Sequence, residues 1–421
     1  MLLIHSPSRL LAAAADTELL ALLIALAVLI AGAKVMGSLS VRIGQPAVLG
    51  ELMAGLLFGP TFLNLLNWPL MGGERSGEVI HLLGQLGVLW LMFAAGLEVE
   101  LTELRRSGRP ASLAGVFGVV GPIAMGLGLA LAFGLPQTQA IFLGITLSAT
   151  SVSISAQTLL ELGRLRSREG IALLGAAVID DVLVIVSLSL FVVAVSGEGD
   201  ATALVAVIGR MAVVLVAVSV LAMVVLPRLV SWAQRLRASE GVLAIVLASV
   251  LLLAWATEYL GGVAAITGAF LAGLGLGRSH LREEIEHGLH RLAYAFFVPL
   301  FLVDIGLQAN LRVLDTSDLL FAVLVIIVAI VSKVVGSGLG ARLGGFEWKP
   351  AFRMGLGMIS RGEVGLIVAG VGVTSGILES GLFSIIVLMV LVTTLATPLL
   401  LRWAFSGEEA RDVSTGHPGH S

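Results

Sequence analysis

Two adjacent acidic residues, Asp180 and Asp181, interrupt an otherwise apolar run of the sequence from about Ile171 to Val195. The run is long enough to cross a lipid bilayer, and the two acids fall near its middle. An ionisable side chain at that depth costs several kcal/mol unless a partner or a water-filled cavity solvates it. Because a carboxylate holds either a proton or a small cation, the pair predicts a proton- or cation-transfer site inside the membrane.

A lysine in another apolar run is the natural partner for one of these acids. Lys333 lies well inside the run 316–343, at a depth comparable with that of Asp180 and Asp181. Neighbouring residues on a helix diverge by roughly 100°, so the two acids must have different surroundings. Pairing offsets much of the cost of two buried charges, so we expect one Asp to face Lys333 and the other an aqueous cavity. A purely structural ion pair is the alternative.

Two further runs have compositions unlike those of ordinary membrane helices. One contains six hydroxyl side chains between Thr146 and Ser155, among them Thr150 and Ser151. The other has four glycines around Arg361 and Glu363. Irregular backbone at membrane depth is tolerated where it lines a cavity or is buried in protein, so we expect both helices to be broken. The alternative for the first run is that its hydroxyls bond to the preceding helical turn and bend it.

Arg361 and Glu363 form a second candidate pair of buried charges. Two residues apart on a regular helix they point about 200° from each other, so pairing requires unwound backbone or other partners. We favour a structural role, as a charge brace for the broken region. The remaining charges lie nearer to the ends of apolar runs. We expect Lys34 and Arg210 to extend toward the interface, and Glu51, Glu98, Glu258 and Asp304 to be solvated there.

Composition places all of these residues in a membrane protein. Of the 421 residues, 57% are hydrophobic and 13% charged, and the mean hydropathy is +1.04, which excludes a soluble globular chain. There is no cysteine, and therefore no disulfide or zinc-thiolate site. The apolar runs predict an all-α protein with thirteen transmembrane helices at 17–43, 46–66, 78–98, 110–135, 138–161, 168–195, 201–230, 239–260, 262–279, 287–308, 316–343, 349–376 and 379–404.

The distribution of basic residues predicts the orientation in the membrane. With thirteen spans, eighteen Lys and Arg fall on one side, and only Arg9, Arg75 and Arg312 on the other. The positive-inside rule then puts the N-terminus outside and the C-terminus in the cytoplasm. The residues 406–421 form a short polar cytoplasmic tail.

A weak internal repeat relates the two halves of the chain. Residues 50–59 resemble residues 268–277, and the following spans agree at 91–98 and 300–307. The copies are seven spans apart, an odd number, so they enter the membrane from opposite faces. Inverted-topology repeats are typical of secondary transporters with a site near the midplane, although small-residue patterns also arise from helix packing.

Together these motifs resemble the monovalent cation:proton antiporter family, most closely the NapA-type sodium/proton antiporters. The resemblance covers nearly the whole chain and rests on five motifs in order, Arg42-Ile43-Gly44-Gln45-Pro46-Ala47-Val48-Leu49-Gly50-Glu51, Ala149-Thr150-Ser151, Ile179-Asp180-Asp181, Ser332-Lys333 and Ile359-Ser360-Arg361-Gly362-Glu363-Val364-Gly365-Leu366. It implies an NhaA/NapA-like fold with two crossed broken helices, and a homodimer whose core domain moves like an elevator. Ser360 stands where some relatives have proline.

The resemblance also implies roles for individual residues. Asp181 matches the acid that binds the ion, Asp180 the acid that pairs with lysine, here Lys333, and Thr150 and Ser151 match hydroxyls beside the Na⁺ site. It divides the chain into a dimerisation domain at 1–105 and 239–312, a linker helix at 197–238, and a core domain at 106–196 and 313–405.

We therefore expect a non-enzymatic transporter in a bacterial inner membrane that exchanges Na⁺ or Li⁺ for H⁺ with net charge movement. Hard monovalent cations prefer the carboxylate and hydroxyl oxygens that this site offers, and no cofactor or nucleic acid is implied. The alternatives are K⁺/H⁺ exchange, an electroneutral antiporter, a passive channel and an intramembrane aspartyl protease. The protease requires facing acids on different helices, which adjacent residues on one helix do not provide.

Overall fold

The structure is a computed structural model that describes residues 7–99, 107–196, 201–235, 240–308, 312 and 319–414. These residues form helices and connecting turns, with no strand among them. Ten helices in this part of the chain are long and apolar enough to cross a membrane, and two shorter apolar helices are α2 (Ala47–Phe58) and α12 (Ala265–Leu276). The predicted all-α polytopic membrane fold is therefore confirmed.

The chain divides into two compact units. The first comprises Met1–Val88 and Ala293–Arg312. Its described elements are α1 (Pro7–Arg42), α2, a 3₁₀ turn (Leu65–Asn67), the start of α3 (Gly73–Glu98), a π-helical turn (Ala293–Phe297) and α14 (Val298–Leu307). Its core contains Leu29, Ala54, Ile80 and Leu300. Gly44, in the left-handed region at φ 75°, allows the tight turn between α1 and α2.

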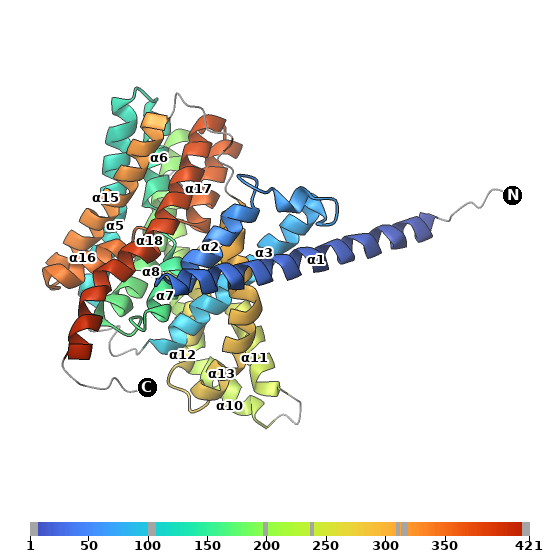
Figure 1. Ribbon diagram of the computed structural model, residues 1–421. Helices are drawn as coiled ribbons and strands as arrows, with labels where there is room; N and C mark the ends of the chain where they lie inside the picture. Colours follow the sequence, from blue (N-terminus) through green and yellow to red (C-terminus); the bar gives the residue numbers. More distant parts are fainter. Residues whose placement is uncertain are drawn as a thin grey trace. The chain divides into compact units, whose positions relative to one another are not determined.

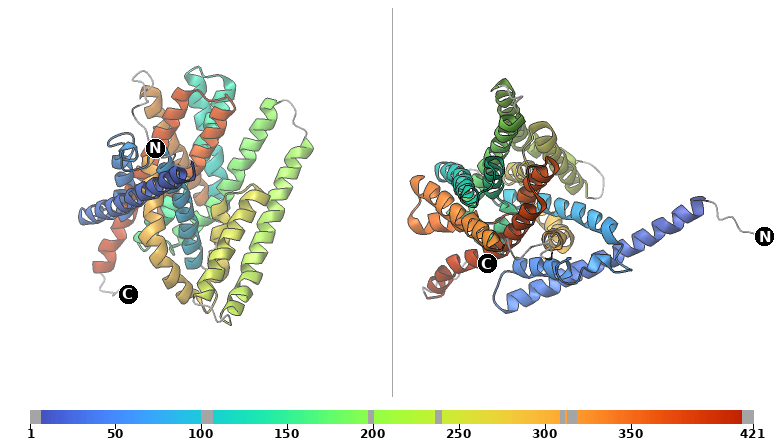
Figure 2. Two further views of the ribbon diagram at one scale, coloured as in Figure 1. Left: turned by 90° about the vertical axis from the view of Figure 1, so that its right-hand side faces the viewer. Right: turned by 90° about the horizontal axis from the view of Figure 1, so that it is seen from above.

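The second unit comprises Leu89–Leu292 and Val313–Ser421. It contains the end of α3 and the elements α5 (Gly108–Ala132), α6 (Gln137–Ser148), α7 (Val152–Glu161), α8 (Arg168–Ser196), α9 (Ala201–Val220), a π-helical turn (Leu221–Val225), α10 (Leu226–Ala233), α11 (Gly241–Trp255), a π-helical turn (Ala256–Leu260), α12, α13 (Arg282–Leu292), α15 (Leu319–Leu343), α16 (Trp348–Gly357), α17 (Glu363–Thr374) and α18 (Ser380–Ser414). Within it α5 lies along α15, and α18 packs beside α15 (Figures 1 and 2).

Both helices that the sequence predicts to be broken are interrupted. Residues Ala149–Ser151 separate α6 from α7, with extended backbone at Ala149 (φ −59°, ψ 135°) and Ser151 (φ −102°, ψ 105°). Residues 358–362 separate α16 from α17. The interruptions lie inside one compact unit, where protein rather than lipid surrounds the irregular backbone, as membrane depth requires.

Glycines let the helices that carry these breaks approach their neighbours closely. A Cβ on Gly144 of α6 would lie 2.6 Å from the carbonyl oxygen of Ile123 in α5. A Cβ on Gly355 of α16 would lie at the same distance from the carbonyl oxygen of Val334 in α15. Small residues at such contacts are a general device of membrane helix packing. Each broken helix is therefore held against an unbroken one through a glycine.

Two acids that we expected to be solvated are buried and paired. Glu51 is only 4% exposed and accepts a hydrogen bond of 2.8 Å from Lys34. Asp304 is 7% exposed and lies 2.8 Å from Nδ1 of His81 and 2.7 Å from Nε2 of Gln308. The interfacial prediction was wrong for both residues, because a neighbouring helix supplies a polar partner that hydropathy does not reveal.

Candidate functional site

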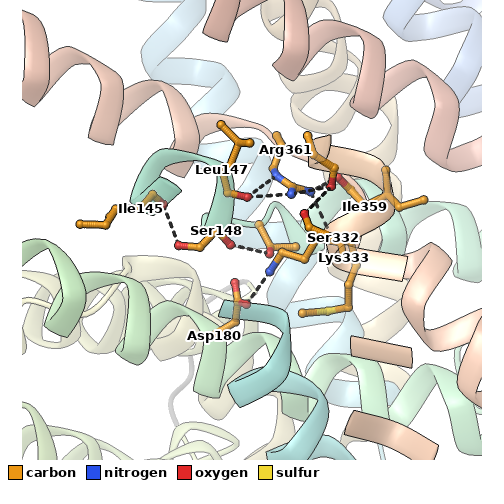
Figure 3. Close-up of polar contacts among 11 residues, drawn as sticks. Ile145, Leu147, Ser148, Asp180, Ser332, Lys333, Ile359 and Arg361 are labelled. Carbon is orange, nitrogen blue, oxygen red and sulfur yellow. Dashed lines mark hydrogen bonds and ion pairs between the residues drawn. The ribbon is translucent and has the colours of Figure 1, made fainter. Parts of the chain in front are cut away.

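The centre of the second unit holds an ion pair between α8 and α15. Nζ of Lys333 donates to Oδ1 of Asp180 over 2.6 Å, and both side chains are completely buried. Figure 3 shows the two side chains pointing toward each other from the two helices. The other carboxylate oxygen of Asp180, Oδ2, is buried and has no hydrogen-bond partner among the described residues. Asp180 thus keeps one oxygen available for a proton or a cation.

Asp181 points to different surroundings, as adjacent positions on a helix require. It lines a small cavity in the second unit together with Met92, Val152, Leu174, Ala177, Val178, Ile266, Thr267 and Phe270. The walls are apolar except for Asp181 and Thr267, and Asp181 keeps 6% of its surface exposed. The structure therefore brings Lys333 to one acid and a cavity to the other.

The break between α6 and α7 supplies buried hydroxyl groups beside the ion pair. Thr150 and Ser151 are both buried, and Thr150 lies near the carboxylate of Asp180. The Thr150 hydroxyl also donates to the carbonyl oxygen of Ser148 over 3.3 Å. Thr146 and Ser148 bond to carbonyls of their own helix, as the alternative interpretation of this run anticipates. The hydroxyls at the break itself remain the candidates for ion contact.

Arg361 is completely buried and binds the carbonyl ends of the two half-helices. Its guanidinium donates to the carbonyl of Leu147, at the end of α6, over 3.1 Å from Nε and 2.7 Å from Nη2. It also donates to the carbonyls of Met358 and Ile359, just after α16, and over 3.0 Å to that of Ala329 in α15. Figure 3 shows this arrangement. A cation at two helix C-termini complements their partial negative charge.

The side chain of Glu363, the candidate partner of Arg361 in the sequence, lies outside the described part of the structure. Among the described residues, Arg361 donates to backbone carbonyls. The sequence did not indicate these partners, because backbone carbonyls carry no residue-type signal and those of Leu147 and Ala329 belong to segments far from residue 361. A clue was available for one neighbour: Thr394 stands in the middle of the last apolar run, and its hydroxyl donates to the carbonyl of Arg361.

The two breaks bind each other directly through serines. The backbone N–H of Ser151 donates to the carbonyl of Ser360 over 2.9 Å, and the Ser360 hydroxyl donates back to the carbonyl of Ser151. Ser155 donates to the carbonyl of Gly357 over 2.5 Å. Gly362 permits this approach, because a Cβ there would lie 2.8 Å from Cβ and Oγ of Ser151. Ser360, which stands where some relatives have proline, thus takes part in the contact between the two breaks.

These features together make a site suited to a small cation that competes with protons. Two carboxylates in different surroundings, a buried ammonium, and hydroxyls on irregular backbone are available within one unit. Oxygen ligands of this kind suit hard cations. A buried arginine fixes the backbone around them without providing an ion ligand.

Comparison with known proteins gives a consistent result. The family model described as "Sodium/hydrogen exchanger, transmembrane" matches residues 22–407. The chain is 37% identical over 387 residues to the "Na(+)/H(+)-K(+) antiporter GerN" of Bacillus cereus, covering 91% of this chain and 96% of that protein. It is 35% identical over 433 residues to the "High-affinity Na(+)/H(+) antiporter NhaS3" of Synechocystis, covering 95% of this chain and 93% of that protein. Its fold is similar to that of the sodium proton antiporter MjNhaP1 of Methanocaldococcus jannaschii, with a TM-score of 0.66, 17% identity, and 93% and 98% coverage.

Proposed function

Because this chain belongs to the transmembrane sodium/hydrogen exchanger family, a family of monovalent cation:proton antiporters, we propose that it exchanges Na⁺ or Li⁺ for H⁺ with movement of net charge. The names of its relatives, which are antiporters, support a transporter rather than an enzyme. The observation that supports the proposal most is that the two acids have different surroundings. Asp181 lines a cavity, and Asp180 accepts a hydrogen bond from Lys333.

Exchange follows from competition for the same oxygens. A proton or a sodium ion occupies the carboxylate of Asp181, which the cavity reaches, but the two do not bind there together. Thr150 and Ser151 add neutral oxygen ligands, and Oδ2 of Asp180 adds a charged one. A cation bound this way needs no ATP for its coupling, because loading one ion releases the other.

Lys333 supplies a second coupling element. A cation that approaches Asp180 weakens the 2.6 Å bond between the carboxylate and the ammonium, because the two positive charges share one carboxylate. Release of a proton from Lys333 then adds a second proton to the cycle, so that the exchange carries charge. Both protons return when the site faces the other side.

Alternating access requires a moving body that keeps the site intact. We propose that the segments 106–196 and 313–405 form this core domain and move like an elevator against a dimerisation domain formed by 1–105 and 239–312. Arg361 and the serine contacts hold the two broken helices together, so they move as one piece. In this proposal the linker helix 197–238 joins the two domains.

Thirteen membrane crossings and an inverted repeat complete the proposed architecture. Beyond the ten long helices, α2, α12 and the α16–α17 pair would each cross. The repeat draws support from matched glycine contacts, Gly144 against α5 and Gly355 against α15. With thirteen crossings the N-terminus lies outside and the basic loops face the cytoplasm of a bacterial inner membrane. A homodimer in membrane lipid is part of the same proposal.

Potassium exchange is the second candidate, favoured by a specific observation. The name of GerN, which covers 91% of this chain at 37% identity, includes both sodium and potassium. An electroneutral exchange remains an alternative of the same scaffold.

The test is transport in proteoliposomes under a clamped voltage. We expect sodium and lithium gradients to drive proton movement, with a rate that depends on voltage. A proton flux driven by potassium but not by sodium would replace the sodium proposal with the potassium one. A voltage-independent rate would contradict net charge movement.

A further inference from the structure

A glycine allows a close approach of three helices beside the ion pair. A Cβ on Gly118 of α5 would lie 3.5 Å from Nζ of Lys333 and 3.6 Å from Oδ1 of Asp180, and it would collide with Oγ of Ser337. Because Gly118 has no side chain, the Ser337 hydroxyl takes the position that a Cβ would occupy, where α5, α8 and α15 meet. Two polar side chains from α15, Lys333 and Ser337, therefore lie beside Gly118.

Ser337 is a buried residue whose hydroxyl has no hydrogen-bond partner among the described residues. Several other buried hydroxyls of this unit bond to backbone carbonyls, for example that of Ser332 to Ala329 and that of Thr393 to Met389. A buried hydroxyl without a hydrogen-bond partner costs about 1–3 kcal/mol. We therefore expect another state of the protein in which the Ser337 hydroxyl forms a hydrogen bond.

The neighbouring ammonium has hydrogen-bonding capacity to spare. Lys333 carries three N–H donors, and Asp180 takes one of them, with no further hydrogen bond from this ammonium to the described residues. Ser337 follows Lys333 by four positions on α15, so both side chains lie on the same face of that helix. The lysine needs only to rotate its own side chain to bring its ammonium toward the Ser337 hydroxyl.

We propose that Ser337 is a positioning residue, the acceptor that receives the Lys333 ammonium when a cation displaces it from Asp180, before the lysine releases its proton. Gly118, which has no side chain, lets the Ser337 hydroxyl lie close to the ion pair. The inference rests on the proposed sodium exchange and adds a place for the displaced lysine. Without such an acceptor, cation binding would leave a buried ammonium with no partner, a costly state in a low-dielectric interior.

The test is Ser337→Ala in proteoliposomes, with the apparent KM for sodium and the maximal rate measured separately. A hydrogen bond to a charged group contributes about 1.5–3 kcal/mol, which corresponds to roughly a tenfold or greater change in affinity. We expect the apparent KM to rise about tenfold or more and the maximal rate at saturating sodium to change much less. Ser337→Thr, which retains the hydroxyl, should restore the KM of the wild type.

A matched control is Ser249→Ala in α11, where the lost hydroxyl bonds, among the described residues, to the carbonyl of Ile245 in its own helix. It should leave the KM unchanged. Gly118→Ala would push the Ser337 hydroxyl out of its position and should also raise the KM. If this variant does not fold, the Ser337 variants alone test the inference. A KM for Ser337→Ala within twofold of the wild type would overturn the inference while leaving sodium exchange standing. Absence of sodium-driven proton movement in the wild type would instead defeat the proposed function.

A double variant distinguishes an effect of Ser337 that acts through Lys333 from one that acts through a bound water molecule. Stabilisation of the purified protein against heat by sodium reports cation binding without transport. If Ser337 acts through Lys333, removing the hydroxyl from the Lys333→Gln variant should cause no further loss of sodium stabilisation. An equal loss with and without the lysine would show that the hydroxyl acts through water or the ion itself, and would overturn the positioning role.

Discussion

Replacing Arg361 by methionine tests how the broken helices are held together. The guanidinium is fully buried and satisfies carbonyls of Leu147, Ala329, Met358 and Ile359. Each buried carbonyl left without a donor costs about 1–3 kcal/mol. Partial relaxation, entry of water and the relief of a buried charge offset part of this sum, so we expect a net loss of about 3–5 kcal/mol in the free energy of unfolding.

The assay is thermal unfolding of the purified protein in detergent, together with sodium-driven proton transport. We expect the melting temperature of Arg361→Met to fall by about 5 °C or more and transport to be lost, because the site loses its backbone geometry. Arg361→Lys should rescue little, since an ammonium cannot span three helices as a planar guanidinium does.

Arg228→Met provides the control for this prediction. Arg228 is exposed and, within the part of the chain that the structure describes, donates to the carbonyl of Val224 one turn earlier, so its loss should shift the melting temperature by less than about 1 °C. An Arg361→Met variant that melts with the wild type and still transports would refute the role of Arg361 as a brace.

Three other outcomes follow from the same contacts. Lys333→Gln should keep sodium binding at Asp181 but lose the voltage dependence of exchange, measured as proton flux under a clamped voltage. Asp304→Ala, which removes the partner of His81 and Gln308, should lower the free energy of unfolding by about 1–3 kcal/mol with the ratio of sodium to potassium transport unchanged. Gly144→Val and Gly355→Val should each lower the free energy of unfolding by about 1–3 kcal/mol or more, because the new side chain meets backbone of α5 or α15. Gly128→Ala should be tolerated in the same melting assay, because a Cβ at Gly128 has no neighbour within 4 Å.

The central polar residues were predictable because they break a strong apolar pattern. Asp180, Asp181 and Lys333 stand out in runs where hydrophobic residues are otherwise continuous, and helical geometry alone requires that the two acids face different surroundings. Hydroxyls and glycines likewise marked the segments in which α6 separates from α7 and α16 from α17.

The partners of charged residues were harder to predict, because they depend on tertiary contacts. Arg361 was predicted to have a structural role, but the backbone carbonyls that it binds carry no residue-type signal, so the sequence did not identify them. Glu51 and Asp304 were assigned to the interface from hydropathy, although Lys34 and His81 lie on neighbouring helices that pack against them. The position of the Ser337 hydroxyl beside the ion pair depends on the absence of a side chain at Gly118, on a different helix.

The claim on which the account depends is that one carboxylate, Asp181, holds a proton and a cation in turn. Its most direct test is proton release from the purified protein when sodium is added in weakly buffered solution. The account predicts that the wild type releases protons as it binds sodium, and that Asp181→Asn neither binds sodium with wild-type affinity nor releases protons. Sodium binding by the wild type without proton release, or undiminished release from Asp181→Asn, would contradict it.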